Sequence, residues 1–181
     1  ETVINSSGGV SDGDLMYFSP YPDNPTYQHR FILVYAQGGS RGIMHCLEAT
    51  SSNGLNDSGQ SEINGSATAG HLALATSGGT YGASYYNMLC MWRTYTSGSP
   101  MKYIRFSYSP GNPGSINLGS ATNSGIDDTQ YISLAYDTGA SKYIVGYRSN
   151  SDNDLEVAVG TESSTSSMTF GTPADISGLT V

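Results

Sequence analysis

Alternating hydrophobic and polar positions, separated by clusters of turn residues, run through residues 131–176. Ile, Leu and Tyr occupy every second position of 132–136, and Leu and Val do so in 155–159, which is the period of a half-buried β-strand. Residues 142–148, between them, are rich in the β-branched and aromatic residues that strands favour. Asp, Gly, Asn and Ser fill the connections, because these residues adopt turn conformations easily. With a last apolar segment before Pro173, the pattern predicts four short antiparallel strands in about 46 residues, the size of one propeller blade.

Weaker copies of this unit occur twice in the preceding sequence. The pair Trp92-Arg93 recurs as an aromatic-Arg pair at 147–148, and segment 63–68 returns at 116–122 with one residue inserted. The copies predict three repeats of about 55 residues each, and such a shared period is a stronger signal than any single motif. Their expected bounds are about 11–68 for repeat 1, about 69–122 for repeat 2 and about 127–176 for repeat 3.

Four antiparallel strands are expected in each repeat, in the same order. First strands are expected at 15–20, 72–77 and 132–137, and second strands at 31–37, 86–94 and 142–149. Third strands are expected at 42–50, 101–109 and 154–162, and fourth strands at 61–66, 115–119 and 168–172. Segment 1–7 resembles an additional, leading fourth strand.

The repeats predict one all-β domain over residues 1–181. A four-stranded sheet cannot cover both of its faces alone, so we expect the repeats to stack in a propeller-like arrangement. Three blades are fewer than the roughly four to eight that close a ring, so other subunits or the rest of a longer chain are expected to complete it. Two copies giving six blades is one symmetric solution. A β-sandwich or a fibre module of linearly stacked sheets is the alternative architecture.

Composition and charge narrow the classes of function. Only 12% of the residues are charged, and Gly (23) and Tyr (14) are frequent, which is typical of turn-rich β-proteins. The net charge of −8 argues against nucleic-acid binding, which needs a basic surface, and against docking on anionic membranes. The sequence has no run of 18 apolar residues, so no membrane insertion is expected. The chain begins at Glu1 without Met, which predicts a processed product or part of a longer chain.

The two cysteines, Cys46 and Cys90, both lie in apolar segments. Buried free thiols are the favoured interpretation. A disulfide stays open as an alternative, because it requires Cα atoms within about 7 Å and the sequence does not fix that distance. Cysteine usage therefore does not determine the cellular compartment.

The third repeat carries a family resemblance. Its segments Ile-Ser-Leu-Ala-Tyr-Asp (132–137), Tyr-Ile-Val-Gly-Tyr-Arg (143–148), Val-Ala-Val-Gly-Thr (157–161) and Phe-Gly-Thr-Pro (170–173) resemble the repeats of propeller domains in tail-fibre and other appendage proteins of marine bacteriophages. The second repeat matches in part and the first more loosely. The resemblance implies a virion or surface-appendage protein, with attachment to a host surface as an expected role.

No catalytic centre is predicted. Asp137-x-Gly139-x-Ser141 partly resembles the Asp-box turn of sialidase-type propellers, but that turn is structural and remote from catalysis. A sialidase also needs an arginine cluster that grips a carboxylate. Arg93 and Arg148 instead occupy equivalent positions of two repeats, which indicates a repeated structural role.

Metal binding has little support. Acidic residues at alternate positions offer oxygen ligands of the kind that Ca²⁺ prefers, at Asp152, Asp154 and Glu156. No twelve-residue calcium-binding loop surrounds them, so solvated turn acids are favoured over a calcium site. The histidines lack metal-binding spacing and are expected at structural or surface positions: His29, His45 and His71.

An aromatic-rich segment of repeat 2 is the candidate ligand site. Aromatic rings stack on the apolar faces of sugars, while nearby polar side chains bind the hydroxyl groups. The candidate residues are Tyr81, Tyr85, Tyr86, Trp92, Arg93 and Tyr95. The competing interpretation, which is favoured, is that these rings fill sheet surfaces and repeat interfaces.

These features predict a non-enzymatic structural or adhesive module of a virion or extracellular appendage. Low charge and abundant Ser, Thr, Asn and Gly suit a setting exposed to proteases. A carbohydrate-binding, lectin-like propeller is the first alternative, and a sialidase-like glycosidase fragment is the second.

Overall fold

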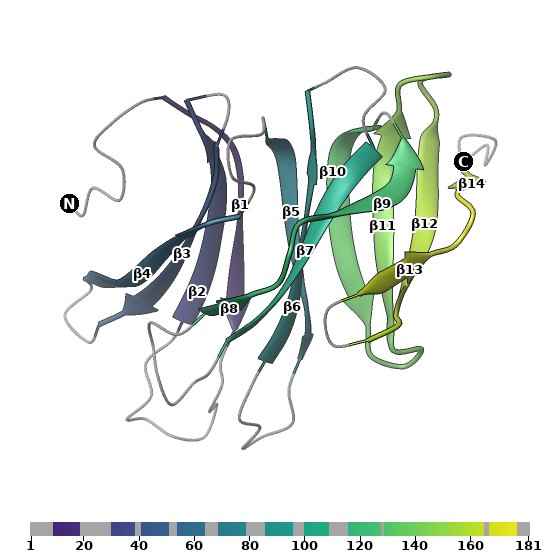
Figure 1. Cartoon of the computed structure of the whole chain (residues 1–181). Helices are drawn as coiled ribbons and strands as arrows, with labels where there is room; N and C mark the ends of the chain where they lie inside the picture. The colour runs from purple at the N-terminus through teal and green to yellow at the C-terminus, as the bar shows by residue number, and fades with distance from the viewer. Residues whose placement is uncertain are drawn as a thin grey trace.

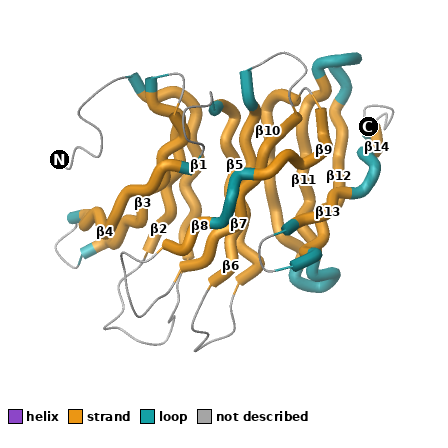
Figure 2. Tube along the Cα trace, viewed as in Figure 1, coloured by secondary structure: helices purple, strands orange, loops and turns teal. Residues whose placement is uncertain are grey.

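The computed structural model describes residues 9–18, 30–38, 41–50, 54–63, 69–78, 86–95, 100–108, 116–127, 129–164 and 167–176. Every secondary-structure element assigned in this part of the chain is a β-strand, so the expected all-β class is confirmed (Figure 2). Among these residues there is no helix of the length and apolarity that crossing a membrane requires.

The described residues form three antiparallel sheets that follow one another along the chain (Figure 1). Sheet 1 contains, in order, β1 (Val10–Phe18), β2 (Arg30–Gln37), β3 (Arg41–Ala49) and β4 (Leu55–Glu62). Sheet 2 contains β5 (Gly70–Gly78), β6 (Tyr86–Arg93), β7 (Pro100–Tyr108) and β8 (Ile116–Leu118), and β9 (Thr122–Asp127) also pairs with β7. Sheet 3 contains β10 (Thr129–Asp137), β11 (Lys142–Ser149), β12 (Leu155–Glu162) and β13 (Met168–Phe170), and β14 (Ala174–Asp175) also pairs with β12.

Sheet 2 lies between sheets 1 and 3 and buries both of its faces (Figure 1). On β6, Met88, Cys90 and Trp92 belong to the core cluster shared with sheet 1. Leu89 and Met91 belong to the second cluster, which is shared with sheet 3. Because successive strand residues point to opposite faces, the continuous apolar run of β6 matches a strand that is buried on both sides.

Polar contacts also join neighbouring sheets. Arg30 of β2 donates a hydrogen bond to the hydroxyl of Tyr108 on β7, which links sheets 1 and 2. Arg105 of β7 forms an ion pair of 2.8 Å with Glu162 of β12, which links sheets 2 and 3. Burial raises the pKa of Tyr108, so its hydroxyl stays protonated at the interface.

Both cysteines are free and fully buried in the cluster between sheets 1 and 2. The expectation of buried free thiols is therefore confirmed, and the disulfide alternative is not realised. Desolvation raises the pKa of both thiols, that of Cys46 to about 11.

The first strand of each sheet lies at the centre of the stack. β5 packs against both β1 and β10. Among the described residues, each of these three strands forms backbone hydrogen bonds with only one neighbouring strand, namely β2, β6 or β11. The opposite edge of each inner strand therefore faces the middle of the molecule.

The expected strand positions need two corrections. The fourth strand of sheet 1 runs over Leu55–Glu62 rather than 61–66. Segment Thr122–Asp127, for which no strand was predicted, forms β9 and pairs with β7. Most of the first, second and third strands begin and end within about two residues of their predicted positions, whereas β1 and β10 begin earlier than predicted. Segment 1–7, the expected leading strand, lies outside the described residues.

Candidate functional site

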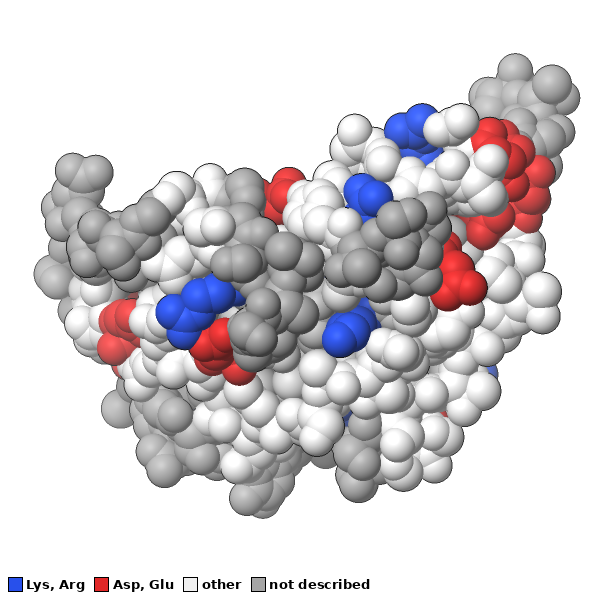
Figure 3. All heavy atoms as spheres, turned by 45° about the horizontal axis from the view of Figure 1, so that its top comes forward, with Lys and Arg blue, Asp and Glu red and all other residues white. Residues whose placement is uncertain are grey.

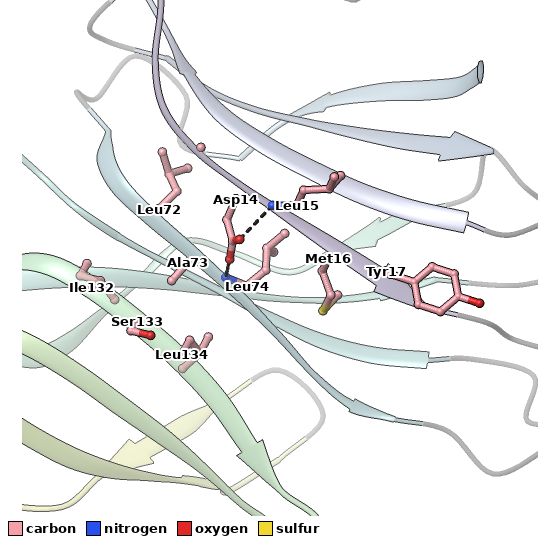
Figure 4. Close-up of a pocket in the computed structure, with 11 residues that line it drawn as sticks. Asp14, Leu15, Met16, Tyr17, Leu72, Ala73, Leu74, Ile132, Ser133 and Leu134 are labelled. Carbon is pink, nitrogen blue, oxygen red and sulfur yellow. Dashed lines mark hydrogen bonds between the residues drawn. The ribbon is translucent and has the colours of Figure 1, made fainter. Parts of the chain in front are cut away.

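A cleft of about 540 Å³ opens between the three inner strands (Figure 4). It is lined by Gly13, Asp14, Leu15, Met16 and Tyr17 of β1, by Leu72, Ala73 and Leu74 of β5, and by Ile132, Ser133 and Leu134 of β10. A smaller pocket of about 270 Å³ shares Gly13, Leu72 and Ile132 with this cleft, so the two spaces are neighbours.

Backbone groups and one carboxylate give the cleft its polarity. The unpaired edges of the inner strands present N–H and C=O groups, which require hydrogen-bond partners. Asp14 satisfies two of them, because its Oδ1 accepts from the N–H of Leu15 and its Oδ2 accepts from the N–H of Leu74, each at 2.8 Å (Figure 4). One side chain of β1 thus ties two inner strands together.

Each inner strand carries a β-bulge at the same place. Before the bulge, Ser11 pairs with Ala36, Gly70 with Arg93, and Gln130 with Arg148, and the register shifts directly afterwards. The next residue in each strand has a positive φ: 49° at Asp12, 49° at His71 and 53° at Tyr131. Structural equivalence across the three sheets is therefore visible at the level of single residues.

The side chains at these three positions line the smaller pocket together. A left-handed backbone costs a non-glycine residue about 1–3 kcal/mol, and glycine would adopt it without strain. The chain nevertheless places a carboxylate, an imidazole and a phenol there. Asp12, His71 and Tyr131, together with the neighbouring Tyr95, are called the aromatic mouth below.

Ring contacts hold the aromatic mouth together. The centroid of the His71 ring lies 4.9 Å from that of Tyr131 and 6.4 Å from that of Tyr95. Tyr131 is 63% exposed and Tyr95 is 47% exposed. Both tyrosines are therefore accessible to solvent: Tyr131 lines the pocket, and Tyr95 lies beside its lining residues Asp12 and His71.

Tyr95 is fixed from several sides. Its hydroxyl donates to Asp12 Oδ2 at 3.2 Å, and the Arg93 guanidinium carbon lies 5.3 Å from its ring centroid. A Cβ atom on Gly70 would lie closer than 3.0 Å to the Tyr95 ring, so the ring can take this position only beside a glycine. Partial burial and the Asp12 carboxylate raise the pKa of Tyr95, which keeps the hydroxyl protonated as a donor.

The structure separates the predicted ligand residues. Arg93 and Tyr95 belong to the aromatic mouth or contact it, whereas Trp92 is 0% exposed in the core between sheets 1 and 2. The backbone of Tyr86 pairs with Tyr108 at the opposite end of β6. Tyr81 and Tyr85 lie outside the described residues. Sequence reasoning did not assign Asp12, His71 or Tyr131 to the site, because the predicted first strands, starting at 15, 72 and 132, do not align Asp12 with the other two; the bulges show that the three are equivalent.

The acidic residues proposed for calcium do not form a ligand set. Across the described ranges, no group of three or more His, Cys, Asp and Glu side chains could hold a metal ion. Glu156 Oε2 accepts a hydrogen bond of 2.6 Å from the Tyr147 hydroxyl. Hydrogen bonds from Ser149 and from the backbone of Asp154 lower the pKa of Asp152, as expected for a turn acid.

The arginines of the described residues do not form a cluster. The described arginines contact different partners: Arg30 contacts Glu48, Arg41 contacts Glu62, Arg93 contacts Tyr95, Arg105 contacts Glu162, and Arg148 contacts Gln130 and Asn153. On the face that Figure 3 shows, Lys and Arg form small separate groups, one of them beside acidic residues.

A buried Asp–His–Tyr chain lies elsewhere in sheet 1. His45 Nδ1 is 2.7 Å from Asp57 Oδ2, and His45 Nε2 is 3.0 Å from the Tyr35 hydroxyl. The His45 side chain is only 1% exposed, so it joins β2, β3 and β4 rather than meeting a ligand. This agrees with the expectation of a structural histidine.

No protein-family model matches this chain, and no curated protein shows significant sequence similarity to it. The site therefore has to be interpreted from its own geometry and chemistry.

Proposed function

We propose that this chain is a non-enzymatic structural and adhesive module of a virion or extracellular appendage, built as part of a β-propeller. One observation carries the proposal. Equivalent residues form the interface between sheets 1 and 2 and the interface between sheets 2 and 3, and sheet 3 exposes the corresponding face on its other side. The arrangement of the first strands around a common cleft also fits a propeller, whose blades place their first strands at the centre.

Registers identify equivalent residues in the third strands. Tyr35 pairs with Ile43, Trp92 with Lys102, and Tyr147 with Glu156. Three residues further along the third strands lie Cys46, Arg105 and Val159, which are therefore equivalent.

These equivalent residues meet the next sheet in both interfaces. Cys46 of sheet 1 hydrogen-bonds Tyr108 of sheet 2, and Arg105 of sheet 2 pairs with Glu162 of sheet 3. Tyr108 and Glu162 are also equivalent, because each follows its sheet's residue of the previous set, Arg105 or Val159, by three positions. Each sheet thus packs on the following one through a repeated, head-to-tail contact.

Sheet 3 leaves this face without a described partner. Val159 is 43% exposed and Leu155 is 50% exposed, although both are apolar residues of a strand. Their neighbours Ile144 and Val157 are only half-buried. A further sheet, from a second copy of this chain or from further repeats of a longer chain, would bury these side chains and extend the stack toward a ring.

Introducing charge on this face tests the proposal. We expect the protein to sediment as an assembly larger than 19.1 kDa and Val159→Lys to dissociate it, because burying an unpaired ammonium group is strongly unfavourable. Ala121→Lys, at an exposed position between β8 and β9, is the matched control and should leave the mass unchanged. A stable 19.1 kDa monomer whose mass is unaffected by either substitution would contradict the proposal.

Carbohydrate binding is the second candidate function. The observation that favours it is the aromatic mouth, which offers two solvent-accessible phenol rings beside a carboxylate at the end of a polar cleft. Adhesion to a glycan is compatible with a structural role, because the mouth and the exposed face of sheet 3 involve different residues.

A further inference from the structure

We propose that the aromatic mouth binds one neutral saccharide unit, with the rest of the glycan extending into the cleft between the inner strands. This inference deepens the adhesive part of the proposed function and rests on it. It concerns Asp12, His71, Tyr95 and Tyr131, which contact one another across β1, β5, β10 and the end of β6.

Size limits the ligand in the pocket. The pocket of about 270 Å³ is smaller than the roughly 300–1,000 Å³ of sites for drug-sized ligands, so it accepts one small unit. The cleft of about 540 Å³ lies directly beside it and shares three lining residues with it, so the further units of a longer ligand can lie along the inner strands. An oligomeric ligand fits this two-part space better than a compact one.

Charge selects a neutral ligand. The Asp12 carboxylate disfavours an anion at the mouth. A cation is disfavoured as well, because the Arg93 guanidinium already lies against the Tyr95 ring, 5.3 Å from its centroid. The two opposite charges flank the aromatic mouth, so a ligand without net charge meets the smallest electrostatic penalty.

Surface chemistry then favours a saccharide over an apolar molecule. The exposed Tyr131 ring offers a flat apolar surface to the C–H face of a pyranose. Asp12 accepts hydrogen bonds from hydroxyl groups, and His71 has a ring nitrogen for the same purpose. Further along, Ser133 and the unpaired strand edges offer hydroxyl, N–H and C=O groups. Alternating apolar and hydroxyl-binding surfaces are what a sugar ring requires.

The site is also held in place before a ligand binds. Tyr95 is fixed by Asp12, by Arg93 and by the backbone of Gly70, and the three bulges set the direction of the other side chains. Such preorganisation lowers the entropic cost of binding.

Glycine substitution separates binding from folding. Tyr131→Gly removes the stacking ring but suits the φ of 53°, so we expect an unchanged or higher Tm and binding weaker by about tenfold or more. Tyr131→Phe should stay within about threefold of the parent protein, because the ring remains. Ser141→Gly, at an exposed turn residue with a φ of 55°, is the matched backbone control and should not change binding.

The measurement is an array of neutral hexose and N-acetylhexosamine oligosaccharides, followed by calorimetric titration of the best-bound one, with choline and acetate as cationic and anionic competitors. The expected result is binding that neither competitor displaces and that Tyr131→Gly weakens by about tenfold or more. Three results would overturn the inference: no oligosaccharide binds at millimolar concentration, Tyr131→Gly binds like the parent protein, or choline displaces the sugar. Sedimentation of the same variants reports on assembly independently, so failure of the saccharide site is distinguishable from failure of the proposed propeller module.

Discussion

Cys46 places its thiol in the interface between sheets 1 and 2, where it hydrogen-bonds Tyr108. Desolvation raises the pKa of the thiol from 9.0 to about 11. The folded protein therefore binds this proton more tightly than the unfolded chain does. At neutral pH the neutral thiol behaves as a small apolar group, and its titration affects stability only in alkaline solution.

Stability is expected to fall as the pH rises from about 9 to about 11. The contribution of Cys46 is fully present below its unfolded pKa and is lost as the pH rises through its folded pKa. Urea titrations over this pH range measure the effect. The free energy of unfolding of Cys46→Ala should fall less steeply with pH than that of the parent protein, and the two slopes should differ by up to about 1.4 kcal/mol per pH unit.

Met44→Ala is the control for the cavity that Cys46→Ala creates. Met44 is also fully buried in the same cluster but does not titrate. The substitution Met44→Ala should lower the free energy of unfolding at neutral pH and leave the dependence of that free energy on pH between about 9 and 11 unchanged. An identical alkaline slope for Cys46→Ala and the parent protein would refute the assignment.

At the scale of elements, periodicity predicted the strands whose residues alternate or are apolar throughout. The β6 segment Met88–Trp92 is recognisable because both of its faces are buried. β9 was missed, because Thr122–Asp127 is mostly polar and forms a strand only by pairing with β7. The bulges at Asp12, His71 and Tyr131 were missed for a related reason: a one-residue shift between two strands leaves no periodic signal in either strand.

The candidate site was predictable only in part. Tyr95 and Arg93 were identified as candidates because they lie in an aromatic-rich segment. Trp92 belongs to the same segment but is buried, and adjacent positions of one strand point to opposite faces. Asp12, His71 and Tyr131 come from three different strands, so only tertiary structure brings them together.

Gly70 is the element-scale test of the site. A Cβ at this position would collide with the end of the half-exposed Tyr95 ring, so Gly70→Ala should turn Tyr95 away from Asp12 and lower the free energy of unfolding by about 1 kcal/mol, the net contribution of one hydrogen bond. Gly146→Ala is the matched control in β11, because nothing lies within 4 Å of its added Cβ. Chemical unfolding measures both variants. Equal stabilities for the two variants would show that Tyr95 does not rest on Gly70.

For the whole molecule, cohesion depends on sheet 2, since it contributes to both core clusters. Arg105 joins this central sheet to sheet 3 through Glu162 and the backbone oxygen of Ser164. Arg105 is almost completely buried, whereas Glu162 is about one-third exposed. Water therefore screens the pair in part, and the ion pair contributes less than a fully buried one would.

Arg105→Ala is expected to lower the free energy of unfolding by about 1–3 kcal/mol, because Glu162 loses its partner at the interface between sheets 2 and 3. Arg41→Ala removes the exposed ion pair with Glu62 and should cause no measurable change. Urea titration of both variants at low and high salt provides the comparison. A larger effect at Arg41 than at Arg105 would contradict this account of how the sheets adhere.

The three bulges have a consequence for how this protein can diversify. Because backbone pairing on both sides of each bulge sets its shape, the side chains at 12, 71 and 131 are not needed to fill a core. The recognition proposed for the aromatic mouth and the cohesion of the sheets thus depend on largely separate sets of residues. A combinatorial library restricted to these three positions, one from each sheet, would vary the chemistry of the pocket on an unchanged scaffold.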